Sequence, residues 1–396
     1  MSSETSATSG PDPRTSKRRV ALISVHYVRS ERRAGFHWLA EAFRDLGWDV
    51  TFVTTAFSHL SRLKLDHRFK YGIDRRAGRL EDVEPGLRSY VWFTPYHPLN
   101  RLPRILQPAM TPLFRRYADL PTPGLQAAIA PSDLVIFESA PGLVLADRVR
   151  TWAPNARLVY RVSDDLRVQR AHPVTIEAER QALPLFDLVS VPSEGVGRAI
   201  GDLPTVRLHR HAIDRASFDA PSVDPYSHHV EANAVFVGVA QLDTESLRMA
   251  ARELPGWRFH VIGPLRVPRV ANIVGYGEMP FAATVPYIVH ADVGLGMRVP
   301  VAGAEVFSDS LKIVQYTYAR LPFVVPQEMQ SGRAHSFSYV SRDASSIRQA
   351  LLAARRFDRS QIDRSGILDW RDLARELAGP LATSRGADAL AGSSLT

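Results

Sequence analysis

The sequence predicts an α/β protein of two domains, each built on a mostly parallel sheet covered by helices. Continuously apolar runs of strand length recur along the chain, and amphipathic stretches of helical length separate them, which is typical of strands buried in parallel sheets. A polar stretch near residues 215–232 interrupts this alternation, which then begins again. The chain has 396 residues, enough for two domains of ordinary size.

The first domain opens with a strand–helix–strand unit. Residues 19–24 (RVALIS) form a buried strand, 26–33 a basic turn, 34–46 an amphipathic helix, and 48–54 the next strand. The turn lies at the carboxyl end of the first strand, where open α/β sheets bind ligands, but the GxGxxG motif of dinucleotide sites is missing. Further strands are predicted at 89–94, 132–138, 156–162, 188–191 and 204–211, and helices at 142–152 and 175–183.

The second half repeats the pattern. Strands are predicted at 234–238, 258–262, 272–276, 293–297 and 323–325, and helices at 246–254, 281–290, 346–356 and 370–381. We therefore expect a Rossmann-like domain over 18–214, a linker over 215–232 and a second Rossmann-like domain over 233–345. C-terminal helices follow over 346–381, and one of them is a candidate to cross back to the first domain. Disordered tails are expected at both ends, rich in Ser, Thr and Pro over 1–17 and in Ala, Ser and Gly over 382–396.

Basic residues are concentrated in the first domain. Residues 1–120 hold 20 Lys and Arg against 12 Asp and Glu, and the other 276 residues hold 29 of each, so the net charge of +8 falls in the first part. Such a domain suits an anionic partner, whether nucleic acid, a diphosphate lipid or an acidic membrane surface. The chain has no cysteine, which excludes disulfides and thiolate metal sites and fits a reducing compartment.

Two basic, apolar segments favour contact with a membrane surface. Residues 57–70 alternate apolar and basic side chains, and residues 99–117 mix Leu, Ile, Met and Phe with four arginines and three prolines. Such segments can lie among lipid headgroups; the alternative is helices packed on their own sheet with solvated arginines. No apolar run reaches the roughly 18 residues that span a bilayer, and the first residues are no secretory signal.

Residues 305–325 indicate a phosphate-binding helix. Ser308, Asp309 and Ser310 are helix-capping types before a run of helix formers, and Leu321-Pro322 ends the helix. A helix N-terminus carries free N–H groups and partial positive charge, to which Lys312 in the first turn adds a full charge. The alternative is a capped surface helix with a solvated lysine.

Candidate catalytic and binding residues follow other strands. Asp164, just after the strand at 156–162, is placed to act as a general base, or else to cap a turn. Gly277, Glu278 and Met279 lie between a strand and a helix; the glycine permits close backbone approach, and Glu278 can accept ribose hydroxyls or cap the helix.

The first loop is basic, with His26, Arg29, Arg32 and Arg33, which suits phosphate recognition unless these side chains are merely solvated. The thirteen histidines show no metal-ligand spacing such as HExxH, and we expect neither metal nor cofactor.

Several stretches together resemble glycosyltransferase family 70, the GumK-type glucuronosyltransferases. The resemblance covers about residues 20–345, and the order and approximate spacing of its motifs match as well. The motifs are the set from His26 to His37, SRLKLDHR at 61–68, SDLVIFES at 132–139, LVYRVSD at 158–164, FHVIG at 259–263, YGEM at 276–279 and SLKIVQY at 310–316.

This resemblance implies a GT-B fold, two Rossmann-like domains with the active site in the cleft between them. It implies inverting, metal-independent transfer of glucuronic acid from UDP-glucuronate to a polyprenyl-diphosphate-linked oligosaccharide of bacterial exopolysaccharide assembly, by a peripheral protein on the cytoplasmic face of the inner membrane.

By the same resemblance, Asp164 takes the catalytic-base position. The donor would contact Gly277, Glu278, Met279, Arg298, Ser310, Leu311, Lys312 and Gln315, and the acceptor His26, Arg29, Arg32 and Arg33.

The sequence departs from the family at two places near the donor. Met297-Arg298 stands where the family has an aromatic residue, and Ala240 stands where it has a methionine. Donor identity is therefore open: Arg298 can pair with a uronate carboxylate or compensate for another sugar. A transferase for another UDP-sugar, a UDP-sugar epimerase or hydrolase, and a non-catalytic protein that binds anionic lipid or nucleic acid remain alternatives. The basic segments lack the stacking aromatics of a nucleic-acid module, so no nucleic-acid partner is expected.

Overall fold

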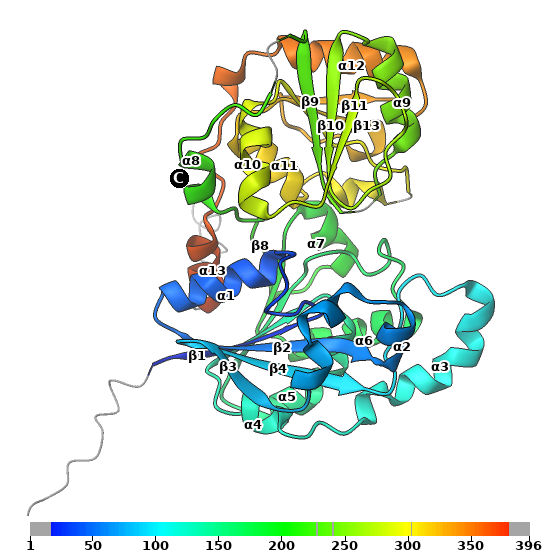
Figure 1. Ribbon diagram of the computed structural model, residues 1–396. Coiled ribbons are helices and arrows are strands. Elements are labelled where there is room, and N and C mark those ends of the chain that lie inside the picture. Colours follow the sequence, from blue (N-terminus) through cyan, green and yellow to red (C-terminus); the bar gives the residue numbers. More distant parts are fainter. Residues whose placement is uncertain (1–16, 227–228, 240, 302, 380–396) are drawn as a thin grey trace, which may run out of the picture.

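The computed structural model describes residues 17–226, 229–239, 241–301 and 303–379. Ala240, the C-terminal tail and, apart from residue 17, the N-terminal tail lie outside these ranges. Two α/β domains stand one above the other, with helices on the faces of each sheet (Figure 1).

The first domain contains an eight-stranded sheet, parallel except at one edge. In spatial order its strands are β3 (Leu80–Glu84), β4 (Leu87–Thr94), β2 (Asp49–Ser58), β1 (Arg19–Ser24), β5 (Leu134–Glu138), β6 (Arg157–Arg161), β7 (Leu188–Val191) and β8 (Val206–Leu208). Its helices are α1 (Gly35–Asp45), α2 (His59–Leu63), α3 (Gln107–Arg115), α4 (Leu125–Ile129), α5 (Ala146–Trp152), α6 (Pro173–Ala182) and α7 (Glu194–Ile200). The antiparallel edge strand β3 was not predicted, because its half-exposed, charged residues give no apolar run.

The second domain contains a six-stranded parallel sheet. Its strands, in spatial order, are β11 (Ile273–Gly277), β10 (Trp257–Ile262), β9 (Ala232–Val237), β12 (Val293–Leu295), β13 (Phe323–Pro326) and β14 (Ser336–Tyr339). Its helices are α8 (Arg215–Asp219), α9 (Thr244–Glu253), α10 (Phe281–His290), α11 (Leu311–Tyr318) and α12 (Ala344–Arg356), with a 3₁₀ turn η7 (Ala304–Phe307) before α11. The predicted two-domain α/β architecture is confirmed.

The chain passes between the domains twice. The first passage lies before α8, earlier than the predicted linker at 215–232, because Phe218 of α8 is buried against Tyr318 of the second domain, with ring centroids 5.9 Å apart. In the second passage the chain leaves α12, which stays on the second sheet, and returns to the first domain as α13 (Trp370–Ala378).

The helix α13 lies beside α1 (Figure 1), where Trp370, Leu373 and Leu377 join the core of the first domain. The two passages run side by side: the Ile213 N–H donates to the Leu368 carbonyl at 3.0 Å, and Ile213 forms a parallel bridge with Asp369.

Glycine is required where the loops after neighbouring strands of the second sheet meet. Gly263, just after β10, has φ +143°, and a Cβ there would lie 1.8 Å from the carbonyl oxygen of Gly238 after β9. Gly277 has φ +76°, but a Cβ there would meet nothing within 4 Å. Glycine at 277 therefore reflects the left-handed backbone rather than the close approach that the sequence suggested.

We expect Gly263→Ala to lower the melting temperature of the second domain by about 5 °C, because a left-handed φ and a backbone clash together cost on the order of 2 kcal/mol. Differential scanning calorimetry measures this shift. Gly366→Ala is the matched control: its φ is not positive and a Cβ there meets nothing, so it should leave the melting temperature unchanged. A Gly263→Ala protein as stable as the wild type would contradict this account of the loops.

Candidate active site between the domains

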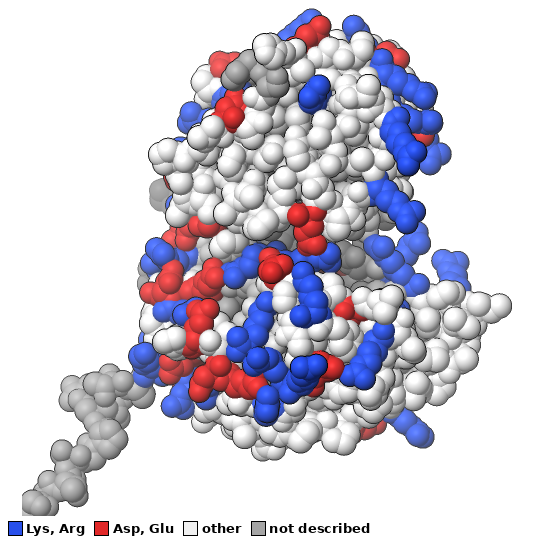
Figure 2. All heavy atoms as spheres, in the orientation of Figure 1, with Lys and Arg blue, Asp and Glu red and all other residues white. Residues whose placement is uncertain are grey.

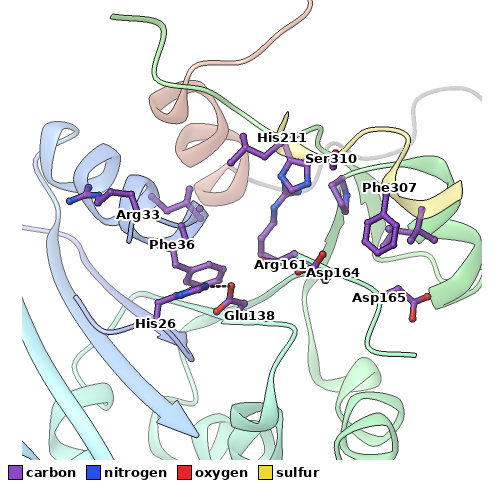
Figure 3. A pocket seen from close by; sticks show the side chains of 18 of the residues that line it. His26, Arg33, Phe36, Glu138, Arg161, Asp164, Asp165, His211, Phe307 and Ser310 are labelled. Carbon is purple, nitrogen blue, oxygen red and sulfur yellow. Dashed lines mark ion pairs between the residues drawn. The ribbon is translucent and has the colours of Figure 1, made fainter. Parts of the chain in front are cut away.

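A cleft of about 350 Å³ lies between the two domains. His26, Glu138 and Asp164, at the carboxyl ends of β1, β5 and β6, line this cleft, and open α/β sheets bind ligands at these ends. Residues of both domains line the cleft, among them His26, Arg33, Phe36, Glu138, Arg161, Asp164, Asp165, His211, Phe307, Ser310, Leu311 and Trp370 (Figure 3).

Asp164 lies in the loop after β6 and lines this cleft. Ser139, which follows the neighbouring strand β5, fixes the loop, because its Oγ accepts the N–H groups of Ser163 at 3.1 Å and Asp164 at 3.0 Å. The next residue, Asp165, is used in the local turn, where its carboxylate accepts the N–H groups of Arg167 and Val168. The two carboxylates therefore have different roles, and Figure 3 shows their side chains pointing apart.

The environment of Asp164 suits a general base at neutral pH. Burial raises the pKa of this carboxyl group to about 6. The negative charge of Glu138 adds to the rise, whereas Gln169 and the positive charges of Arg298 and His26 oppose it. A base with a pKa just below the working pH is ionised and still basic enough to take a proton.

A partly buried ion pair lies beside Asp164. Glu138, the last residue of β5, accepts a hydrogen bond from Ser24 Oγ at 2.6 Å, and its Oε1 lies 3.5 Å from His26 Nε2. Burial lowers the pKa of His26, but Glu138 more than offsets this, so that the pKa is raised. Since β1 and β5 are neighbours whose connections leave in opposite directions, this pair occupies the topological switch point of the first sheet.

The N-terminus of α11 borders the same cleft through Ser310 and Leu311. The predicted side-chain capping is wrong: Ser310 is the N-cap residue, but its hydroxyl makes no capping hydrogen bond. Asp309 instead forms ion pairs with Arg333 and, across the domain boundary at 3.2 Å, with Arg210. The first turn of α11 therefore has no side-chain acceptor at its N–H groups, which leaves them for a ligand anion.

Lys312 does not line the Asp164 cleft; it faces the adjoining end of the second sheet. Its Nζ lies 3.3 Å from the centroid of the Phe236 ring, and equally close to the place that a Cβ on Gly238 would take. Burial lowers the pKa of Lys312 well below its usual value, and Arg298 lowers it further. Gln315 lies one turn further along α11 and is half-buried.

The positive charge of Arg298 acts on both groups: it lowers the pKa of Asp164 and the pKa of Lys312. Met297 is fully buried in the core, and Arg298 stacks on Phe307. Phe307 lines the cleft. Of the pair Met297-Arg298, it is thus the cation that lies beside the cleft.

Glu278 is paired with the other domain. Both of its carboxylate oxygens accept from the guanidinium of Arg32, in the first loop of the first domain, with Nη2–Oε2 at 3.0 Å. Arg32 thus lies against the second domain. Met279, the next residue, packs on the core of the second domain.

The other basic residues of the first loop are spread over two hollows. Arg33 lines both the Asp164 cleft and a second hollow, where it pairs with Glu41. Arg29 lines only the second of these two. His37 fixes the loop: its ring accepts from Ala34 N–H and contacts the Tyr27 carbonyl, and burial lowers its pKa to about 4.

Sequence reasoning missed Glu138, Arg161, His211 and Trp370, which all line the cleft. Glu138 and Arg161 are charged residues that end otherwise apolar strands, and this pattern could have indicated them. Arg161 also has a structural role, because its guanidinium donates hydrogen bonds to Ser190 Oγ and to the His209 carbonyl. Trp370 reaches the cleft because α13, in the segment that the sequence marked as a candidate to cross back, packs on the first domain.

Comparisons with known proteins agree with this geometry. Residues 22–192 match the model of the family described as glucuronosyltransferase GumK, N-terminal domain. Over 369 residues the chain is 30% identical to the UDP-glucuronate:glycolipid 2-beta-glucuronosyltransferase of Xanthomonas campestris pv. campestris, which covers 91% of this chain and 89% of that protein.

The chain belongs to the GumK family of glucuronosyltransferases. It is therefore a glycosyltransferase. Solved structures place this GumK relative in the GT-B fold, as its sequence predicted. Sucrose-phosphate synthase of Thermosynechococcus elongatus superimposes with a TM-score of 0.57 at 14% identity, covering 91% of this chain and 98% of that one. Anabaena Alr3699/HepE in complex with UDP and glucose gives a TM-score of 0.59 at 11% identity, covering 92% and 98%.

The Arg32–Glu278 pair should compete with a nucleotide if Glu278 binds ribose. We expect Arg32→Met to tighten the binding of UDP by up to about fivefold, because a half-exposed ion pair is worth at most about 1 kcal/mol. Isothermal titration calorimetry measures this. Arg62→Met, which breaks the Arg62–Asp74 pair within the first domain, is the control and should leave UDP affinity unchanged. Weaker UDP binding by Arg32→Met would instead show that Arg32 contacts the nucleotide itself.

Proposed function

We propose that this GumK-family protein transfers glucuronic acid from UDP-glucuronate, with inversion and without a metal, to a polyprenyl-diphosphate-linked oligosaccharide of bacterial exopolysaccharide assembly. The observation that carries the proposal is the placing of Asp164, whose pKa is about 6, in the same cleft as the uncapped N-terminus of α11. The relative's name as a glycolipid glucuronosyltransferase supports the choice of donor and acceptor class.

The proposed reaction is a single displacement. Asp164 takes the proton of the acceptor hydroxyl, and the acceptor oxygen forms a bond to the anomeric carbon from the face opposite UDP. The bond from that carbon to the UDP oxygen breaks, and UDP leaves with the electron pair. Lys312 and the N–H groups of α11 stabilise the charge that grows on the diphosphate, which is the role of a metal ion in other transferases. Within the described residues, no group of three or more His, Asp or Glu side chains is placed to hold a metal.

The donor would lie across the second sheet, with its ribose at Glu278 and Met279 beyond the left-handed Gly277. Its diphosphate would lie at Ser310, Leu311, Lys312 and Gln315. The acceptor would enter along the first loop, where His26 and Arg33 line the cleft and Arg29 and Arg32 extend the basic surface. Figure 2 shows basic side chains at the level where the two domains meet.

Asp164→Asn should abolish transfer and leave UDP binding largely intact, since Asn cannot accept the proton. Lys312→Ala, in contrast, should weaken UDP binding and transfer together. The comparison requires a transfer assay with a glycolipid acceptor and calorimetry with UDP. Transfer near the wild-type rate by Asp164→Asn would disprove the base assignment. Release of free sugar without acceptor as the main activity would instead favour a hydrolase.

The pH profile provides an independent test. Below its pKa, Asp164 is protonated and cannot act as a base, so kcat/KM should fall about tenfold per pH unit below pH 6 and level off above it. A profile measured from pH 4.5 to 8.5 with protein that stays folded over that range checks this. An acid limb with a midpoint near pH 4 would place catalysis on a solvated carboxylate and not on Asp164.

We further propose that the protein lies on the cytoplasmic face of the inner membrane. No helix among the described residues is long and apolar enough to cross a bilayer. Large apolar side chains are exposed in the two segments that favoured membrane contact: Leu63 at 81%, Leu65 at 89% and Ile105 at 86%. These segments continue from the ends of β2 and β4, which are parallel neighbours, so both leave the sheet on the same side. The surface over α3 is largely uncharged in Figure 2.

The double variant Leu65→Asp with Ile105→Asp should bind vesicles of anionic phospholipid at least about tenfold more weakly, because each leucine or isoleucine contributes about 2 kcal/mol when buried among acyl chains. Vesicle flotation measures the bound fraction. Val223→Asp is the matched control: its side chain is 87% exposed, but it lies beyond the first domain. Equal binding by all three proteins would contradict the proposed membrane surface.

A further inference from the structure

Two cations of the second domain, Lys312 and Arg298, lie next to residues that line the cleft: Lys312 follows Leu311, and Arg298 stacks on Phe307. Neither forms an ion pair with any described acidic residue within 4.0 Å, although both are partly buried. A buried cation without a counter-ion is unfavourable unless a ligand supplies the negative charge. The inference below rests on the proposed function: each of the two charges contacts a different part of the donor.

Arg298 is held rigidly at the topological switch point of the second sheet. Its strand β12 pairs with β9, and the chain after β9 turns back to meet the chain after β12. Val299 N–H donates to the Gln241 carbonyl at 3.0 Å, and Leu242 forms an antiparallel bridge with Arg298. The backbone of Arg298 is thus fixed between two loops at the edge where α/β sheets bind ligands.

The side chain of Arg298 lies against a ring that lines the cleft in which the transferred sugar is proposed to lie. Its guanidinium carbon is 3.4 Å from the centroid of the Phe307 ring, and Phe307 lines the cleft together with Asp164. The reacting carbon of the sugar has to come close to Asp164. Arg298 Nε is buried and has no hydrogen-bond partner, so a donor remains for a ligand.

Lys312 occupies a separate place, on Phe236 and close to Gly238 at the end of β9. It belongs to the first turn of α11, whose N–H groups lack side-chain caps. This combination suits a diphosphate. A planar guanidinium suits a carboxylate, which it binds through two parallel hydrogen bonds.

We propose that Arg298 selects a uronate donor by binding the carboxylate at C6 of the sugar, while Lys312 and the N-terminus of α11 hold the diphosphate. In this arrangement the third negative charge of a UDP-hexuronate, which UDP-glucose lacks, is neutralised by Arg298. A neutral sugar would leave the guanidinium buried without a counter-ion. Discrimination between the two donors then lies in a residue that differs from the family pattern.

The test compares the affinities of full-length wild type and Arg298→Met for UDP, UDP-glucose and UDP-glucuronate by calorimetry at pH 8. At that pH, two units above its pKa of about 6, Asp164 remains ionised, so a change in its pKa on loss of Arg298 does not enter the result. Arg298→Met should bind UDP-glucuronate about 100-fold more weakly, as is typical when one partner of a desolvated charge pair is removed. It should bind UDP and UDP-glucose within about threefold of the wild type.

Two further variants serve as controls. Arg298→Lys keeps the charge without the planar fork and should recover part of the lost affinity. Arg355→Met removes a cation of the same domain that pairs with Asp292 and should change none of the three affinities. Retained UDP binding also shows that the second domain of Arg298→Met is folded.

Other outcomes overturn the inference in distinguishable ways. An equal loss for UDP and UDP-glucuronate would place Arg298 on the diphosphate. An unchanged preference for UDP-glucuronate would assign selection to other residues and leave the proposed function intact. Wild type that binds UDP-glucose as tightly as UDP-glucuronate would remove any role for Arg298 in donor choice, and wild type that binds no UDP compound would disprove the proposed function itself.

Discussion

The binding of an anionic ligand depends on two cations that have no acidic partner within 4.0 Å among the described residues. Lys312 and Arg298 lie at the carboxyl ends of the second sheet, and acidic side chains near them are occupied elsewhere: Asp309 pairs with Arg210 and Arg333, and Glu278 with Arg32. Folding places these cations in a poorly solvated position, which lowers the pKa of each. The binding of an anion relieves this cost, so the same feature that weakens the empty protein strengthens its attraction for a charged ligand.

Opposite these cations, the first domain presents Asp164, a carboxylate whose pKa is raised to about 6 by burial. Asp164 follows β6, and the His26–Glu138 pair occupies the switch point between β1 and β5. The cleft thus lies at the carboxyl ends of the strands, where each sheet alone would bind a ligand. This arrangement explains why His26, Glu138 and Asp164, which lie at the ends of β1, β5 and β6, come together although they are distant in the sequence.

The sequence was sufficient for the architecture and for the residues that follow strands. Apolar runs predicted the parallel sheets, and Asp164, Lys312 and Glu278 were found because each follows a recognisable strand or begins a helix. The charged edge strand β3 escaped because it has no apolar run. Side-chain partners could not be predicted, since the Arg32–Glu278 pair joins residues 246 positions apart.

The same limit applies to capping. Ser308, Asp309 and Ser310 have the composition of a capped helix, but Asp309 finds two arginines in the folded protein and leaves the helix end open. Likewise, α8 was assigned to the linker because Phe218 looks like a residue of a polar linker until its neighbours Phe281 and Tyr318 are known. Tertiary contacts decided each of these features.

The side-by-side passages of the chain at Ile213 and Asp369 determine how the two domains can move. A single connecting strand would let one domain both bend and swivel on the other. Two segments joined by a hydrogen bond oppose this swivelling, and α13 anchors one of them on α1. This double connection therefore favours keeping Asp164 of the first domain opposite the N-terminus of α11 in the second domain.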